Sequence, residues 1–329
     1  MRSVLLTGAT GFVGSATRPA LLARGVHVRC ASRREHTGSA SPNESWVQLD
    51  VSKPERLLPA LEGIDTALYL VHGMGRRGGG GDYAAREAES AERFAAAART
   101  AGVRRIVYLG GVQPTGAASK HLASRSRVGE VLRASGVPTV ELRAGMIVGA
   151  RSESFRIVRD LSLRLPAMVL PRWLEHRSQP VAIEDVVAAL VHAACSDDVP
   201  PGVFALDGPE ALSGRELLEH VAALEGLEAR KVAVPFLTPR LSSYWIGLVT
   251  RADLSIAREL VEGLRTDLYA SDPSYWPLMG GHRPLSFDVA ARHALADEAR
   301  QLPLGAAVLE WVIQRIAPWK RRTHPVEGV

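Results

Sequence analysis

Residues 2–14, RSVLLTGATGFVG, decide the fold: an apolar segment leads into Gly8, Gly11 and Gly14, and a helical pattern begins directly after them. In such a stretch Gly8 permits a tight turn, Gly11 lets the backbone approach a phosphate, and Gly14 lets the helix pack against the strand. The helix N-terminus adds N–H donors and the positive end of a dipole. The alternative is an ordinary glycine-rich turn. Because the next apolar segment, Val26–Cys30, leaves room for a crossover helix, the stretch predicts a turn that binds a dinucleotide pyrophosphate.

Strand and helix patterns alternate through the first half of the chain. Short apolar segments are separated by longer segments in which Ala, Glu and Arg recur. This alternation is typical of an α/β protein with a Rossmann-type, doubly wound parallel sheet. The predicted strands are 2–6, 26–30, 46–50, 66–71, 105–109 and 139–142, and the predicted helices include 54–61, 82–101 and 124–134.

The second half begins with a proline- and arginine-rich stretch and then returns to strands and helices. Asp185 is a predicted N-cap, since apolar residues follow it at helical spacing. Ser213, with Glu216 three residues later, predicts a capping box at the start of a helix. The resulting division is a Rossmann core for NAD(P) at 1–150, an insertion toward the cleft at 151–177, a return to the core at 178–210 that includes a strand at 203–206, a smaller substrate-covering region at 211–302, and an amphipathic helix with a basic tail at 303–329.

The composition is that of an ordinary globular protein, with 46% hydrophobic and 23% charged residues. The formal net charge of +5 is spread along the chain, so it does not favour nucleic-acid binding. Cys30 and Cys195 lie far apart in apolar segments, as reduced core thiols do, and no Cys/His spacing predicts a metal site. No basic leader and no apolar run of about 20 residues is present, which favours a cytoplasmic protein without an integral membrane segment.

Several motifs occur in an order that resembles a known family. Besides the glycine turn, they are Leu49–Val51, Tyr69–His72, Val103–Gly111, Leu142–Gly149 and Phe204–Pro209, and the stretch 237–245 is similar as well. Their order and spacing resemble the atypical, extended short-chain dehydrogenases/reductases of the NmrA-like NAD(P)H-binding subgroup. The resemblance covers at least residues 1–210 and implies a Rossmann fold that holds a nicotinamide cofactor.

The resemblance also implies which positions surround that cofactor. The glycine turn would hold the pyrophosphate, residues after the third strand would lie beside the adenine, and the ends of later strands would approach the ribose and the nicotinamide. The implied residues are Gly8, Thr10, Gly11, Phe12, Val13, Gly14, Asp50, Val51, Val71, His72, Gly73, Gly110, Ala144, Gly145, Met146 and Ile147.

The end of the second strand distinguishes NAD from NADP. NAD-binding proteins place an acidic residue there for the ribose 2′-hydroxyl, whereas arginines accommodate a 2′-phosphate. This chain has Ser32, Arg33 and Arg34 at that point. Guanidinium groups match a phosphate dianion, so the residues favour NADP(H). The alternative is that both arginines are solvated loop charges.

The catalytic positions depart from the family pattern. The resemblance implies a Tyr-x-x-x-Lys pair on the helix after the fifth strand, and this chain contains no such pair. The equivalent positions are His121 and Arg125, one helical turn apart. Histidine titrates near neutral pH and can act as a general acid, whereas Arg125 can hold ribose or phosphate but cannot transfer protons. The alternative for His121 is a solvated residue at the start of a helix.

Aromatic, soft or amide side chains outside the core segments predict an apolar substrate pocket, with core packing as the alternative for each. These residues are Met74, Phe155, Trp173, Gln179, Tyr244 and Trp245. Residues 304–316 have apolar side chains at helical spacing and precede a basic tail. Docking on the chain's own domain or on a second copy, as in a homodimer, is the more common use of such a helix, and peripheral membrane contact is the alternative.

The leading functional hypothesis is an NADP-dependent oxidoreductase that reduces a small apolar carbonyl, quinone or conjugated alkene. Quinones and polarised alkenes need less proton donation than ketones do. The missing Tyr-x-x-x-Lys pair favours an alternative, a non-catalytic NADP(H)-binding regulator or scaffold. A third hypothesis is redox-neutral chemistry, in which a retained cofactor takes a hydride and returns it.

Overall fold

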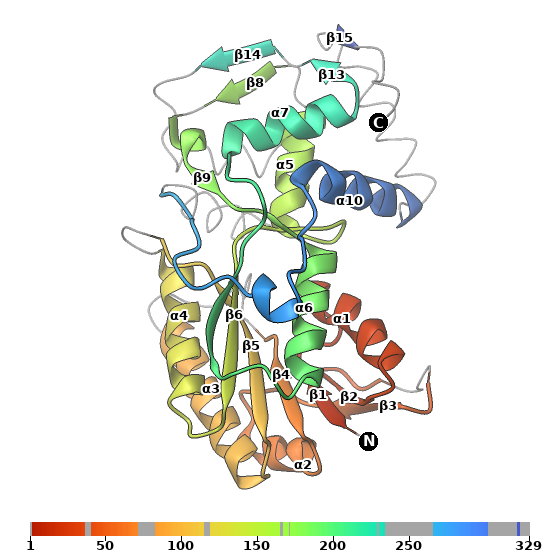
Figure 1. Ribbon diagram of the computed structural model, residues 1–329, viewed down its shortest axis with the longest axis vertical. Coiled ribbons are helices and arrows are strands. Elements are labelled where there is room, and N and C mark those ends of the chain that lie inside the picture. The colour runs from red at the N-terminus through yellow and green to blue at the C-terminus, as the bar shows by residue number, and fades with distance from the viewer. Residues whose placement is uncertain are drawn as a thin grey trace.

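The structure is a computed structural model that describes residues 2–36, 41–71, 83–114, 119–164, 167–170, 172–228, 230–233, 266–301 and 321–322. Its centre is a seven-stranded parallel sheet in the order β11-β6-β5-β4-β1-β2-β3 (Figure 1). The strand order reverses between β1 and β4, which confirms the predicted doubly wound Rossmann sheet. The strands are β1 (Ser3–Leu6), β2 (His27–Ser32), β3 (Glu44–Gln48), β4 (Thr66–Tyr69), β5 (Arg105–Gly111), β6 (Thr139–Ala144) and β11 (Gly202–Leu206).

Helices cover both faces of this sheet (Figure 1). One face packs against α1 (Phe12–Ala23) and α6 (Ile183–Cys195), and the other against α2 (Leu57–Leu61), α3 (Tyr83–Thr100) and α4 (Lys120–Arg133). Side chains of each strand alternate between the two cores. Leu142 joins the α1/α6 core, while Tyr108 joins the core below α2, α3 and α4. Burial on both faces explains why these strands are almost uniformly apolar in sequence.

A smaller layer of helices lies beyond the carboxyl ends of the strands (Figure 1). Here α5 (Glu153–Arg164) and α7 (Gly214–Leu224) pack together, and α10 (Phe287–Gln301) contacts α7. They share a core that includes Phe155, Leu217 and Phe287. The remaining short strands and 3-10 turns are β7 (Ile147–Val148), β8 (Ala167–Leu170), β9 (Arg177–Ser178), β10 (Val181–Ala182), β12 (Leu212–Ser213), β13 (Leu227–Glu228), β14 (Arg230–Ala233), β15 (Arg321–Arg322) and η2 (Arg172–Glu175), together with η1 (Pro54–Arg56) before α2 and η3 (Trp276–Met279) beside α6.

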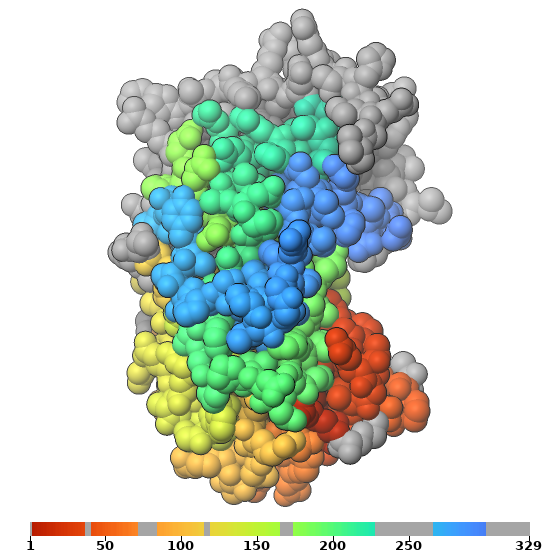
Figure 2. All heavy atoms as spheres, viewed as in Figure 1, coloured from red at the N-terminus to blue at the C-terminus, as the bar shows by residue number. Residues whose placement is uncertain are grey.

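The segment around η3 extends the open edge of the sheet at β11. The amide of Ala205 donates to the carbonyl oxygen of Pro273 at 2.8 Å, and the amide of Tyr275 donates back to Ala205 at 2.9 Å. Figure 2 shows this part of the chain, in blue, lying across the green residues that precede it. The C-terminal part of the described chain is therefore bound to the Rossmann sheet itself.

The predicted helix starts were correct at one position and wrong at another. The capping box at Ser213 is confirmed, since its Oγ accepts from the amide of Glu216 and the Glu216 carboxylate accepts from the amide of Ser213. The prediction that Asp185 is an N-cap is wrong, because α6 begins at Ile183. The buried carboxylate of Asp185 instead accepts from His282 Nε2 at 2.7 Å and from the amide of Leu285 at 2.8 Å.

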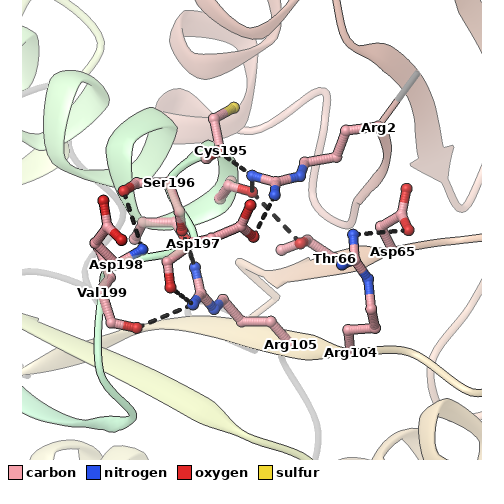
Figure 3. Close-up of polar contacts among 12 residues, drawn as sticks. Arg2, Asp65, Thr66, Arg104, Arg105, Cys195, Ser196, Asp197, Asp198 and Val199 are labelled. Carbon is pink, nitrogen blue, oxygen red and sulfur yellow. Dashed lines mark hydrogen bonds and ion pairs between the residues drawn. The ribbon is translucent and has the colours of Figure 1, made fainter.

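Two arginines at the amino ends of the strands bind the C-terminal end of α6 (Figure 3). Arg105 donates to the carbonyl oxygens of Ala193 and Val199, each at 2.9 Å. Arg2, the residue before β1 on the other side of β4, donates to the carbonyl oxygen of Cys195. Carbonyl groups at the end of a helix have no partner within the helix, so these guanidinium groups satisfy them and complement the negative end of the helix dipole.

In the described part of the chain, no helix is long and apolar enough to cross a membrane. The predicted helix at 304–316 lies outside the described residues, so peripheral membrane contact and a homodimer remain predictions.

Candidate cofactor site and active site

The glycine turn between β1 and α1 is tightly packed. Gly8 has a φ of +67°, a conformation that L side chains rarely adopt. The amide of Gly11 donates to the carbonyl oxygen of Gly8 at 2.9 Å, which closes the turn. A Cβ atom at Gly14 would lie 2.2 Å from the same oxygen, so α1 can approach the turn this closely only with glycine there.

The start of α1 is open to an anion. Its N-cap is the exposed Gly11, which has no side chain to accept from the first amides, and its first turn contains no acidic residue. The helix N-terminus therefore has N–H groups available to an anionic ligand. Arg151 lies near this turn, since its Nη1 donates to Ser15 Oγ at 2.8 Å. These features fit the pyrophosphate of a dinucleotide.

The end of β2 carries a serine and two arginines. Ser32 is buried, and its Oγ accepts from the amide of Arg34 at 3.2 Å. Arg33 and Arg34 are exposed, and neither guanidinium has a hydrogen-bond or ion-pair partner among the described residues. The loop thus presents two cations, and the position that carries an acid in many NAD-binding proteins holds a hydroxyl group.

The residues after β3 and β4 lie at the same edge of the sheet. Asp50 is half-buried, and its Oδ1 accepts from the amide and the hydroxyl of Ser52 at 3.0 and 2.7 Å. Val51 and Val71 are half-buried against the core below α2 and α3. Asp50 therefore forms a turn after β3 rather than projecting alone into a cleft. His72, Gly73 and Met74 lie outside the described residues.

The end of β5 is covered by Arg125 from α4. Arg125 Nη2 donates to the carbonyl oxygens of Leu109 and Gly110 at 2.8 and 3.2 Å. The backbone carbonyl of Arg125 accepts from Tyr108 Oη at 3.0 Å. Burial raises the pKa of the Tyr108 phenol, and the nearby Arg125 guanidinium opposes that shift. Helix α4 and strand β5 are thus joined by three hydrogen bonds at the carboxyl end of the sheet.

His121 precedes Arg125 by one turn and is half-buried. Helix α4 begins at Lys120, four residues earlier than the sequence predicted, because Ser119 Oγ accepts from the amide of Leu122. The earlier start includes both His121 and Arg125 in one continuous helix, as their predicted one-turn relationship requires.

The implied nicotinamide segment follows β6. Ala144 is buried in the α1/α6 core, whereas Gly145 and Met146 are half-buried. Ile147 starts β7, which pairs with β10. This segment and the end of β5 are adjacent, because β6 pairs with β5 in register up to Ala144 opposite Gly111.

Of the six predicted substrate residues, the structure describes the side chains of two, Phe155 and Gln179. Phe155 is fully buried in the core shared by α5, α7 and α10, so it packs rather than lines an open pocket. Gln179 is half-buried, and its Oε1 accepts from the amide of Ala270 at 3.0 Å, which ties two loops together. Trp173 belongs to η2, and its side chain is outside the described set, as are residues Tyr244 and Trp245 entirely.

Some contacts at the site were not predicted from the sequence. The buried Ser124 Oγ donates to Glu87 of α3 and so joins the two helices behind the end of β5. Arg151, beside α1, and Gln48, at the end of β3, also went unpredicted. For Ser124 the sequence does hold a signal, because a polar residue on the buried face of a helix predicts a hydrogen-bond partner there. The other two contacts join segments far apart in sequence and have no local signal.

The parallel sheet, the glycine turn and the open helix N-terminus together define a dinucleotide-binding Rossmann protein. Residues 8–163 match the family model described as NAD(P)H-binding. This match lies within the region whose motifs resemble the atypical, NmrA-like short-chain dehydrogenases/reductases. No curated protein matches the sequence.

Solved structures with this fold include enzymes that act on sugar nucleotides. A nucleoside-diphosphate-sugar epimerase from Staphylococcus aureus has a TM-score of 0.70 at 16% identity, covering 88% of this chain and 100% of its own. A dTDP-glucose 4,6-dehydratase variant from Streptomyces venezuelae with NAD bound has a TM-score of 0.66 at 18% identity, covering 92% and 97%. A short-chain dehydrogenase/reductase superfamily protein from Agrobacterium tumefaciens with bound NAD has a TM-score of 0.63 at 19% identity, covering 91% and 98%. At these identities the likeness is one of fold.

Proposed function

We propose that this protein is an NADP(H)-dependent oxidoreductase that reduces a small apolar carbonyl, quinone or conjugated alkene. The observation that carries the cofactor preference is the end of β2, where Arg33 and Arg34 are exposed and unpaired among the described residues beside the buried Ser32. Guanidinium groups bind a phosphate dianion through charge-assisted hydrogen bonds. A carboxylate at this position, which would repel the 2′-phosphate, is missing.

The residues of this chain divide the work between the two ends of the cofactor. The glycine turn and the N-terminus of α1 bind the pyrophosphate, and Arg33 and Arg34 bind the 2′-phosphate. The cofactor, when bound, supplies a hydride to the substrate carbon. Arg125 holds the end of β5 in place beside the segment after β6, and His121, on the same helix, donates a proton where the reduced substrate requires one.

A non-catalytic binding role is the main competing hypothesis. Its support is that Arg125 occupies the position of the family's lysine and is bound to backbone carbonyl oxygens. A redox-neutral enzyme is the other, and it is supported by the epimerase and the 4,6-dehydratase among the structures with this fold. Neither alternative alters the predicted preference for NADP(H).

The first test is cofactor affinity measured by titration calorimetry. NADPH should bind at least about tenfold more tightly than NADH, a difference of ~1.4 kcal/mol. The double substitution Arg33→Ala with Arg34→Ala should remove most of this preference, while Arg104→Ala, at the opposite edge of the sheet, should preserve it. Equal affinities in the unsubstituted protein would refute the NADP preference.

The second test is turnover. NADPH deuterated at the transferable position should pass its label to a carbon of an enone or carbonyl acceptor, where mass spectrometry of the product detects it, and reduction of a quinone is followed by oxidation of NADPH. Binding without transfer across such a panel would favour the regulator. Isomerisation of a substrate deuterated at the reacting carbon by the NADP⁺-bound protein, with the deuterium retained in the product and no net reduction of the cofactor, would favour redox-neutral chemistry.

A further inference from the structure

A third arginine lies beside the loop that follows β2. Gln48, the last residue of β3, donates through Nε2 to the carbonyl oxygen of Arg33 at 3.1 Å. Its Oε1 accepts from Arg56 Nη1 at 2.6 Å. One amide side chain therefore spans the loop and the guanidinium of Arg56, and it places that cation next to the backbone of Arg33.

The turn after β3 directs Arg56 to this place. Asp50 Oδ1 accepts from both groups of Ser52, and the amide of Lys53 donates to the carbonyl oxygen of Asp50 at 2.9 Å. The chain then enters η1, which ends at Arg56. This reversal returns the side chain of Arg56 to the end of the strand from which the turn began.

The loop itself is held from its other end by a ring contact. The imidazole of His36 stacks on the indole of Trp46, with ring centroids 4.1 Å apart and an interplanar angle of 22°. Trp46 belongs to β3 and lies near Arg18 of α1. Contacts from Gln48 and Trp46 therefore fix the loop between Ser32 and His36 on the edge of the sheet.

Three arginines lie near one another here, with the exposed Glu35 next to Arg34 and the exposed Glu55 next to Arg56 in the sequence. Among the described residues, no carboxylate pairs with Arg33, Arg34 or Arg56, although other exposed arginines, such as Arg104, do pair with one. Like charges held close together repel one another, so two arginines on the loop with a third from η1 beside it fit an anionic ligand with more than one charge.

We propose that Arg56 is a specificity-determining residue that binds the 2′-phosphate of NADP(H), and that Gln48 is the positioning residue that sets its distance from Arg33. This inference rests on the proposed NADP preference. It adds to Arg33 and Arg34, which follow β2, a third phosphate-binding residue that follows β3. Because Gln48 contacts both the loop and Arg56, it couples the two parts of the phosphate site.

The test compares ligands that differ only in this phosphate. Titration calorimetry with NADPH, NADH, 2′-AMP and 5′-AMP separates contacts to the 2′-phosphate from contacts to the rest of the cofactor. Arg56→Ala should lower the affinity for NADPH and for 2′-AMP by about tenfold, the scale of one partly exposed charge-assisted hydrogen bond. The affinity for NADH should not change. Arg104→Ala is the matched control and should change none of the four.

Two variants at Gln48 examine the positioning role. Gln48→Met removes both hydrogen bonds and should weaken NADPH by several-fold, less than Arg56→Ala does. Gln48→Glu places a carboxylate beside Arg56 and should weaken NADPH more than Gln48→Met, because it competes with the phosphate for the guanidinium. Thermal unfolding of each variant shows whether the fold is retained, and Arg56→Lys, which keeps the charge, should recover part of the affinity.

The outcomes separate this inference from the proposed function. If the unsubstituted protein prefers NADPH and loses that preference with Arg33→Ala and Arg34→Ala but keeps it with Arg56→Ala, the inference is wrong and the proposed preference stands. An equal loss of NADPH and NADH with Arg56→Ala also contradicts a phosphate contact. If the unsubstituted protein shows no preference, the proposed function itself fails.

Discussion

Arg125 Nη2 lies 2.8 Å from the carbonyl oxygen of Leu109, so a cation from α4 closes the carboxyl end of β5. In the family pattern a lysine at this position acts on the cofactor ribose. Here Nη2 of Arg125 donates to carbonyl oxygens at the end of β5. The other N–H groups of the guanidinium are the ones that could donate to a ligand. The structure therefore shows a structural role for this side chain, and a contact with the cofactor is the proposal.

The two residues on α4 should respond differently to substitution. His121→Ala should lower turnover by roughly 10²- to 10⁴-fold, the usual effect of removing a positioned acid, with little change in cofactor affinity. Arg125→Ala should weaken cofactor binding and also lower the free energy of unfolding, because two carbonyl oxygens lose a donor. Transient kinetics with a quinone acceptor, together with calorimetry, measures both. A His121→Ala variant that turns over at the unsubstituted rate would show that this histidine is not the acid.

Substitutions at two glycines of the turn should have different effects on cofactor binding and on stability. Gly11→Val places a branched side chain at the exposed start of α1 and should abolish cofactor binding while the fold persists. Gly14→Val would bring a Cβ to about the 2.2 Å contact with the Gly8 oxygen, so it should destabilise the folded protein as well. Calorimetry and thermal unfolding distinguish the two. Micromolar binding by Gly11→Val would show that the cofactor is held elsewhere.

The amino edge of the sheet offers a stability test with a built-in control. Arg105→Ala removes the donor to the carbonyl oxygens of Ala193, in the last turn of α6, and Val199, in the segment after it, and should lower the free energy of unfolding by about 2 kcal/mol. Arg104→Ala, one residue earlier, removes only an exposed pair with Asp65 and should cost no more than about 0.5 kcal/mol. Urea titrations give both values, and similar losses for the two variants would contradict the capping role.

The capping box of α7 predicts a dependence of stability on pH. The Ser213 amide, which donates to the carboxylate of Glu216, holds the pKa of that carboxyl below its ordinary value. A carboxyl whose pKa is lower in the folded protein stabilises the fold above its unfolded pKa of about 4.3, and this contribution disappears as the pH falls through the lower, folded value. Glu216→Gln should therefore lose less stability than the unsubstituted protein between pH 6 and pH 3, measured by urea titration at each pH. Parallel losses in both proteins would mean that the Glu216 charge does not contribute.

Local patterns in the sequence were sufficient for the sheet and for some helix starts. Alternating strand and helix patterns place β1, β2 and β4 within a few residues, and the Ser213–Glu216 pair marks the start of α7 because both partners are close in sequence. The glycine turn is equally local, since its spacing encodes its own geometry.

The contacts that depend on distant segments were not predictable in this way. Asp185 satisfies every local condition for an N-cap, yet its carboxylate binds residues near 285, and no local pattern reports that partner. A phenylalanine such as Phe155 can line a pocket or fill a core, and its complete burial follows only from the packing of α5 against α7. The pairing of Gln48 with Arg56 likewise depends on how the turn after β3 reverses the chain.

The attachment of Arg2 to the end of α6 also constrains when the protein can fold. Arg2 and Cys195, joined by a hydrogen bond, are 193 residues apart in the sequence. During synthesis the ribosome releases the N-terminal strand first, at roughly 5–20 residues per second, so that strand waits on the order of ten seconds or more for its partner. Until then the part of the sheet that α6 covers is exposed, and chaperone binding to the nascent chain should persist until the residues of α6 emerge. The nucleotide-binding sheet is therefore completed late in synthesis, although its signature occupies the first fourteen residues.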